Sequence, residues 1–435
     1  MTAAVLGVRS GRPGTDTEYA STARHLAGRL ASLARRDAGG APVWTGDDVD
    51  PARSSERQTV LRHDRLDDGL LTGRAGIAVA LAAAGRAPGG SPTWSVLASE
   101  AVGALVAAAL AAPAGTADLG WCSGWLGVAR AAGLIGGWAG DSSLVDAGRG
   151  LARRTLTVLA ADLSACPDYP DLLDGTAGHL TAVLAADPGP GAEDLRRRLG
   201  TALLARLLRA GGGAGPLSWP MGGVGPAVVG LAHGGSGITI ALAAARAAGL
   251  DDAARDVGAL ITRTLRWEDE HYHADAGGWP DLRAGSGVPG LAWCHGAPGV
   301  GIAAAYRHLV GQPDGTELAL GRARRAVQAY GLPRGDAPFD GTLCHGLAGI
   351  VELHLLAAEA WPKAAAEHLR TARVVARTLT RAGRDGRPGW VCGVAGGRTP
   401  AVLTGLAGVA LTLVRCHDPA LAPSLAHPGL PAALA

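Results

Sequence analysis

The sequence predicts an all-α protein, an (α/α)7 toroid in which seven inner helices stand inside seven outer ones. Three observations predict this fold. A Gly-x-x-Gly motif precedes an apolar run seven times, at intervals of 50 to 62 residues. An amphipathic segment lies before each apolar run. Ala, Leu and Gly dominate the 435 residues and aromatic residues make up 4%, which favours closely packed helices over sheets.

The seven motifs define the inner ring. Their first glycines are Gly73, Gly124, Gly175, Gly234, Gly296, Gly346 and Gly405. The helix that starts at each motif is apolar on all faces, so we expect it to be buried all round. Paired glycines suit these helices because backbones crowd together at the centre of a small ring.

Amphipathic segments carrying exposed Arg and Glu define the outer ring. Examples are residues 17–36, 144–163, 193–210, 251–267, 317–330 and 364–382. An open solenoid is the alternative, but its end units would need a polar face, and the seventh apolar run is as apolar as the others. We therefore expect one domain over residues 1–435, with a core at about 17–415 and a Pro/Ala-rich C-terminal tail that is either packed or loose.

Charge and composition exclude several classes of function. The net charge is +2, from 40 basic and 38 acidic residues, and no long block of one sign suggests a nucleic-acid surface. The N-terminus lacks the apolar stretch of a signal peptide, and charged residues or glycine interrupt the Ala-rich runs before they reach bilayer length. We expect a cytoplasmic protein that associates with membranes only through partners, if at all. In that compartment its six cysteines are thiols or metal ligands.

A polar residue stands directly before the first glycine of every motif. These residues are Thr72, Ser123, Asp174, His233, His295, His345 and Thr404. Equivalent positions of a toroid lie at one height, so the sequence predicts a polar ring at one mouth of an apolar barrel. A helix N-cap also accounts for Thr72, Ser123 and Thr404.

The chemically reactive residues of this ring come from consecutive units. The fifth and sixth motifs carry Cys294–His295 and Cys344–His345, and thiolate and imidazole together suit Zn²⁺. Four bound ligands would close the metal site and make it structural, whereas three would leave a position open for catalysis. Two buried thiols with two core histidines are the alternative without metal. Asp174 is either an N-cap or a neighbour of the metal ligands.

These motifs resemble the lanthionine synthetase C-like (LanC-like) family over residues 17–415. The most specific stretches are "AWCHGAPG" and "LCHGLAG". The resemblance implies an α/α toroid with one Zn²⁺ per chain, held by Cys294, Cys344 and His345. It also implies catalytic roles for His233 and Asp171. The implied activity adds a peptide cysteine thiol to dehydroalanine or dehydrobutyrine, which closes a thioether ring in a dehydrated precursor peptide.

Two positions depart from the pattern of bacterial cyclases. The residue after the first zinc cysteine is usually Tyr and is His295 here, and the Arg four residues before that cysteine is replaced by Gly290. Either change puts substrate positioning or proton transfer in doubt, and His295 is a competitor for the metal. The chain shows no dehydratase domain, so the resemblance implies a separate dehydratase as a partner.

Other polar groups and functions stay open at this point. The longest polar stretch, residues 266–290, is either a substrate mouth containing His271, His273, Asp275 and Trp279 or a solvated loop. Cys122 shares the register of the zinc cysteines, but a buried structural thiol explains it better. The alternative functions are glutathione addition to dehydroamino acids and a zinc-containing peptide-binding toroid without catalysis. A glycosidase needs facing carboxylates, which Asp171 and Asp174 on one short segment do not supply.

Overall fold

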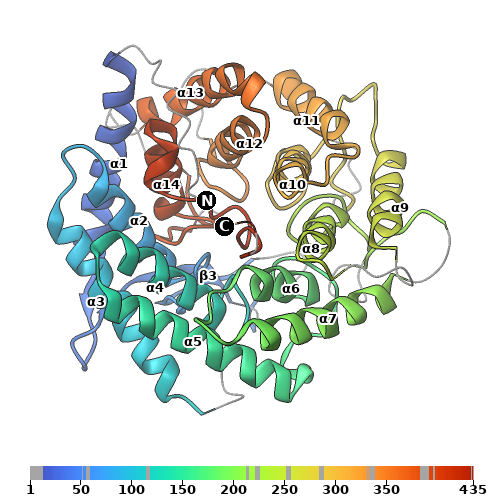
Figure 1. The fold of residues 1–435 in the computed structure, drawn as a ribbon. Helices are drawn as coiled ribbons and strands as arrows, with labels where there is room; N and C mark the ends of the chain where they lie inside the picture. Colours follow the sequence, from blue (N-terminus) through green and yellow to red (C-terminus); the bar gives the residue numbers. More distant parts are fainter. Residues whose placement is uncertain are drawn as a thin grey trace.

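The computed structural model shows two concentric rings of helices around a central bore (Figure 1). It describes residues 13–50, 52–54, 59–113, 118–211, 215–220, 226–250, 256–283, 289–330, 332, 339–382, 391–394, 397–432 and 434. Within these residues, fourteen α-helices alternate between the outer and the inner ring in chain order. The predicted all-α (α/α)7 toroid is therefore confirmed.

The helix bounds follow the sequence pattern closely. The inner helices are α2 (Arg74–Arg86), α4 (Trp125–Ala139), α6 (Thr176–Ala185), α8 (Gly235–Ala247), α10 (Ala297–Leu309), α12 (Leu347–Ala360) and α14 (Leu406–His417). The outer helices are α1 (Pro13–Leu33), α3 (Pro92–Ala111), α5 (Ser142–Ala161), α7 (Glu193–Ala210), α9 (Val257–Glu270), α11 (Thr316–Tyr330) and α13 (Ala365–Ala382).

The ring closes between its last and first inner helices. Helix α14 packs against α2, and the outer helix α1 packs mainly on α14 rather than on α2, which follows it in the chain. Along the rest of the ring, each inner helix packs most closely against the outer helix that follows it. Closure removes the exposed apolar end face that an open solenoid would present.

Helix α3 is the outer helix with the weakest amphipathic pattern. Its outward face carries Val96 and Leu110 as exposed apolar side chains. Among the described helices, it alone has the length and hydropathy of a membrane span, although one third of that stretch is buried against the ring. One such helix is weak evidence for a membrane span.

A tight loop before each inner helix explains the paired glycines. In six of the seven units, the first helical N–H bonds to the carbonyl oxygen seven residues earlier, as Arg74 N does to Asp67 O at 2.9 Å. A Cβ on Gly73 would overlap Asp67, and one on Gly76 would overlap the carbonyl oxygen of Leu70. The glycines are therefore needed because the capping loop lies against its own helix, more than because neighbouring helices crowd the centre.

Main-chain hydrogen bonds link these loops from unit to unit around the bore. They run from Leu71 N to Cys122 O, Leu173 N to Ala232 O, Ala232 N to Cys294 O, Trp293 N to Cys344 O, Cys344 N to Leu403 O and Leu403 N to Leu71 O, at 2.8–3.2 Å. Between the second and third units, the indole of Trp121 donates to Leu172 O instead, at 2.8 Å. We call these linked residues the belt. It holds the polar ring at one height.

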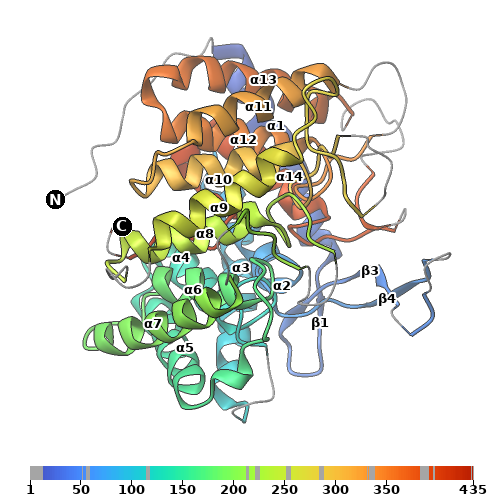
Figure 2. The ribbon, with the colours of Figure 1, turned by 90° about the vertical axis from the view of Figure 1, so that its right-hand side faces the viewer.

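Two short antiparallel pairs of strands lie between α1 and α2, a departure from the purely helical expectation. Strand β1 (Arg35–Arg36) pairs with β2 (Pro42–Val43), and β3 (Thr45–Val49) pairs with β4 (Leu61–Arg65). The β3–β4 hairpin projects from one end of the toroid (Figure 2). It is tied to the loop before α14, because Asp47 N donates to Arg398 O at 2.8 Å. The hairpin therefore lies at the same end of the toroid as the belt.

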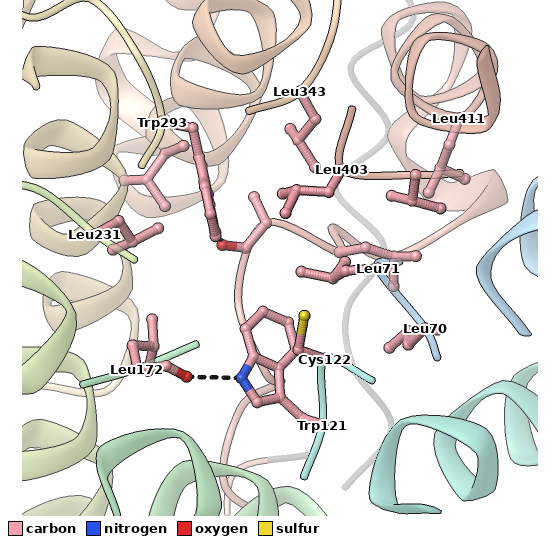
Figure 3. Packing of buried hydrophobic residues seen from close by; sticks show 14 of the residues in the cluster. Leu70, Leu71, Trp121, Cys122, Leu172, Leu231, Trp293, Leu343, Leu403 and Leu411 are labelled. Atoms are coloured by element: carbon pink, nitrogen blue, oxygen red, sulfur yellow. Dashed lines mark hydrogen bonds between the residues drawn. The ribbon is translucent and has the colours of Figure 1, made fainter. Parts of the chain in front are cut away.

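The C-terminal tail is packed inside the bore. It leaves α14, and its end lies at the centre of the ring, on the face opposite the β3–β4 hairpin (Figures 1 and 2). Leu425 and Ala426 are fully buried. Leucines of the belt and its neighbours, together with Trp121 and Trp293, form a buried apolar cluster around the bore (Figure 3), and Leu425 and Ala426 of the tail belong to the same cluster.

Candidate functional site

Three side chains of the fifth and sixth units meet at the belt end of the bore. One donor atom from each of Cys294, Cys344 and His345 lies within 4.8 Å of the other two, and Cys344 Sγ is 3.5 Å from His345 Nε2. Both thiols are buried, whereas His345 is exposed. Among the described residues, this is the cluster with the composition and spacing of a metal site.

The belt positions the two thiols relative to one another. The main-chain carbonyl oxygen of Cys294 accepts from Ala232 N at 3.2 Å, and Trp293 N donates to Cys344 O at 2.8 Å. The main chain of His345 is held by Thr342, whose hydroxyl accepts from His345 N at 3.2 Å. The donors therefore sit on loops whose main chains are held by hydrogen bonds.

The electrostatics of the cluster fit a divalent cation. The hydrogen bond from Cys344, with a further one from His345, holds the pKa of Cys294 well below its usual value despite burial. The pKa of Cys344 is raised, because a second thiolate would face that of Cys294 in a buried place. Thiolate Cys294 in turn raises the pKa of His345. A shared cation removes the repulsion between two thiolates, and two sulfurs with one imidazole form a donor set for Zn²⁺ with one position left open.

His233 and Asp171 form a hydrogen-bonded pair in the same arc of the ring. His233 Nδ1 lies 2.9 Å from Asp171 Oδ2. The other oxygen of Asp171 accepts from the N–H groups of Asp174 and Gly175, at 3.0 and 2.9 Å. Asp171 is 2% exposed and His233 27%, so the carboxylate is fixed beneath an imidazole that solvent reaches.

The pair raises the pKa of His233. Burial alone would lower it, but the hydrogen bond and charge of Asp171, together with the charges of Asp174 and Cys294, outweigh burial. The bond occupies Nδ1, so a proton that the ring exchanges with a substrate passes through Nε2.

His295 does not join the metal donors. Its ring stacks on His233 with centroids 5.7 Å apart, and its Nδ1 is buried without a hydrogen-bond partner among the described residues. Burial lowers the pKa of His295 to about 4, and the nearby cations Arg283 and His233 contribute. The ring therefore stacks on His233 as a neutral group.

Gly290 occupies a place where no side chain fits. Its carbonyl oxygen accepts from Ala297 N at 3.0 Å, and its N–H donates to Trp279 O at 2.7 Å. A Cβ at this position would overlap the carbonyl oxygen of His295. The arginine of related cyclases is thus replaced by a close approach of two main-chain segments. Arg283 is a cation near the thiols, and it pairs with Asp281 at 2.7 Å.

The N-cap explanation for the polar ring is wrong. The N-cap of each inner helix is the first glycine, and no side chain caps it, because the capping loop occupies that space. Thr72 and Ser123 instead donate to the loop carboxylates Asp67 and Asp118. Asp174 likewise caps nothing: burial and the charge of Asp171 raise its pKa to about 6.

The polar stretch before α10 is divided between buried and exposed side chains. Trp279 is buried and donates to Glu268 O at 3.0 Å, and His271 bonds to Trp267 O at 2.8 Å, so both hold the loop. His273 and Asp275 are exposed. Residues 284–288 of this stretch lie outside the described residues.

Glu268 is a supporting residue for which the sequence offered no signal. Its carboxylate accepts from Ser236 N at 2.7 Å and from the Ser236 hydroxyl, in the first turn of α8, just after His233. Burial raises the pKa of Glu268 to about 7. From the sequence, an acidic residue at the end of an amphipathic helix is expected to be exposed to solvent. The first turn of α8, which buries Glu268, meets it only in the folded protein.

The chain matches the family described as "Lanthionine synthetase C-like protein" over residues 64–428. Among solved structures it resembles one titled "Nisin cyclase", with a TM-score of 0.56 and 16% sequence identity, over 81% of this chain and 89% of that one. No curated protein matches it by sequence. The family match spans most of the chain and includes the belt, the thiol cluster and the His233–Asp171 pair, so this protein belongs to the lanthionine synthetase C-like family.

Proposed function

We propose that this protein is a zinc-dependent lanthipeptide cyclase, which adds peptide cysteine thiols to dehydroalanine or dehydrobutyrine and forms (methyl)lanthionine rings. The observation that carries the proposal is the placement of the Cys294–Cys344–His345 cluster in the same arc of the belt as the His233–Asp171 pair. That arrangement supplies a thiol-activating centre and a proton-transfer group at one mouth.

Cys294, Cys344 and His345 would hold the zinc ion, and three protein donors are the number that a catalytic zinc site has. A zinc ion bound there supplies positive charge that favours the thiolate form of a peptide cysteine at neutral pH. A free cysteine with a pKa of ~8.5 is only a few per cent thiolate at that pH.

His233 and Asp171 would manage the protons of the addition. The thiol loses its proton to solvent at the mouth, the sulfur bonds to the β-carbon, and the electron pair of the double bond moves to the α-carbon, which takes up one proton in return. His233 can deliver that proton through Nε2, because Asp171 holds Nδ1 and raises the pKa of the ring. The buried belt beneath them excludes water from this side of the site.

The donor count favours a catalytic site over a structural one. Among the described residues three donors gather, and His295 is not one of them. A closed site with two thiolates and two imidazoles would have argued for a binding protein without catalysis.

Metal content and cyclisation by matched variants test the proposal. The substrate is a synthetic peptide with one dehydroalanine and one cysteine, and mass spectrometry after thiol alkylation distinguishes the ring from the open peptide. We expect stoichiometric zinc and thioether formation above the spontaneous rate for the wild type, and loss of both in Cys344→Ala. Cys122→Ala is the control, because Cys122 is a buried thiol in the same register outside the cluster.

Equal rates for Cys344→Ala and the wild type, or a zinc-free wild type, would overturn the proposal. A second substrate, a cysteine-free dehydroalanine peptide with glutathione, separates the rival activity. Faster addition of glutathione than of the internal cysteine would assign glutathione transfer instead.

The proposed reaction also names partners and a compartment. A dehydrated precursor peptide is the substrate, and a separate dehydratase supplies it. The six cysteines are buried and remain thiols, which supports a reducing compartment such as the cytoplasm.

A further inference from the structure

We infer that the C-terminal tail, residues 419–432, positions the metal centre through Trp293. The tail enters the bore from the end opposite the belt and reaches Trp293, the residue that precedes Cys294. There, the indole Nε1 of Trp293 donates to the carbonyl oxygen of Ala426 at 3.0 Å. The inference rests on the proposed metal site and assigns it a support that its own loops do not provide.

Trp293 is the residue that joins the two thiols. It directly precedes Cys294 in the chain, and its main-chain N–H donates to Cys344 O at 2.8 Å. Its side chain is 1% exposed. A shift of its indole ring therefore moves both sulfurs, and the acceptor that holds the ring sets their separation.

The second unit shows what the tail replaces. Trp121 stands in the same register as Trp293, three residues before its glycine, and donates to Leu172 O of the next unit at 2.8 Å (Figure 3). The equivalent acceptor for Trp293 would be Leu343 O. The bond goes to the tail instead, and this change of partner falls at the boundary between the units that carry the thiols.

Side chains of the inner helices hold the tail by its main chain. Arg130 of α4 donates to Ser424 O and His427 O, at 3.1 and 2.9 Å, and Arg415 of α14 donates to Ala422 O at 2.7 Å. Tyr306 of α10 donates to Gly429 O at 3.0 Å. These donors lie on three sides of the bore, so they place the tail relative to the whole ring.

Directional bonds act on Ala426 in addition to its burial in the core. A cavity of about 1050 Å³ remains beside the tail, lined by helices of both rings on one side and by Ser424, His427 and Leu430 on the other. The hydroxyl of Ser424 donates to Glu352 Oε2 at 2.8 Å and accepts from Ala426 N at 3.1 Å. Ser424 thus fixes the residue whose carbonyl holds Trp293.

Trp293→Phe tests the inference, with Trp121→Phe as the matched control. Both changes keep a buried aromatic ring and remove one indole N–H. Trp293 lies at the boundary between the two units that carry the thiols, whereas Trp121 does not. We expect the dissociation constant for zinc, measured by chelator competition, to rise about 10- to 100-fold in Trp293→Phe, the range for loss of a group that orients a ligand. The visible absorption of the cobalt-substituted protein should shift in that variant. In Trp121→Phe both quantities should stay at wild-type values.

Ser424→Ala provides a second test that leaves every residue of the metal site in place. It releases Ala426 without changing Trp293, so we expect the same cobalt spectral shift and a smaller rise in the dissociation constant. Circular dichroism confirms that each variant is folded. The inference is overturned if folded Trp293→Phe and Trp121→Phe bind zinc equally and give the same cobalt spectrum. It is also overturned if Ser424→Ala matches the wild type. In either case the tail fills the bore without positioning the metal centre.

The outcomes for the tail and for the proposed cyclase can be told apart. Zinc binding that responds to Trp293 and Ser424, in a protein that forms no thioether, would overturn the cyclase and keep the role of the tail. Thioether formation that is lost in Cys344→Ala, with zinc affinity insensitive to both substitutions, would do the reverse.

Discussion

His233 Nδ1 lies 2.9 Å from Asp171 Oδ2, and this bond joins the fourth unit of the toroid to the third. Asp171 is buried and also closes the turn that leads into α6. The carboxylate therefore has two tasks, holding its own loop and setting the tautomer and charge of a histidine from the next unit.

Asp171→Asn separates these two tasks. The amide oxygen can still accept from Asp174 N and Gly175 N, but the negative charge facing His233 is lost. We expect thioether formation to slow by roughly 10²- to 10⁴-fold, the range for loss of positioned acid–base catalysis, with zinc content unchanged. Asp118→Asn is the control, because Asp118 closes the corresponding loop of the second unit by accepting from Gly120 N and Ser123. Similar rates of thioether formation in Asp171→Asn and Asp118→Asn would show that Asp171 only stabilises the loop before α6.

The pH profile of thioether formation should report His233. Its pKa is raised in the folded protein, so the proton-donating form persists above the usual range for histidine and is lost as the pH rises through the raised value. We expect the rate under saturating peptide to fall on the alkaline side and this limb to move to lower pH in Asp171→Asn. A limb that stays in place in that variant would assign it to another group.

His295→Asn should leave the metal content at one zinc per chain. The imidazole of His295 stacks on His233 and stands apart from the three donors. We expect zinc affinity to change by less than the ~10-fold seen when a group that orients a ligand is lost. His345→Asn is the comparison and should lose the metal. A zinc-free His295→Asn protein would mean that four ligands close the site.

Gly290→Arg, which supplies the arginine of related cyclases, should damage the protein rather than improve it. The new Cβ overlaps the carbonyl oxygen of His295, so the loop before α10 must shift. We expect the free energy of unfolding to fall by about 1–3 kcal/mol, as for other overpacked sites, measured by denaturant titration. Gly290→Ala should show most of this loss. Gly150→Ala on α5, where the Cβ meets open space, should be neutral or stabilising.

Much of the arrangement was predictable because a repeat carries positional information. Seven motifs in one register place Cys294, Cys344 and His233 at one height of a ring before any contact is known. The bounds of α7 and α13 follow from amphipathic periodicity. Helix α3 was missing from the predicted outer segments because its outward face is apolar, and the β3–β4 hairpin was missing because its charged residues read as a loop.

The sequence alone determined the number of units, the closed toroid and the donor types at its mouth, because these depend on local periodicity and on residue identity. Only the tertiary structure decided which groups meet. It pairs His233 with Asp171, leaves His295 outside the metal donors, and brings Ala426 beneath Trp293. These outcomes depend on the direction of individual side chains and on the position of a C-terminal tail whose sequence has no helical periodicity. Both are set by hydrogen bonds between residues far apart in the chain.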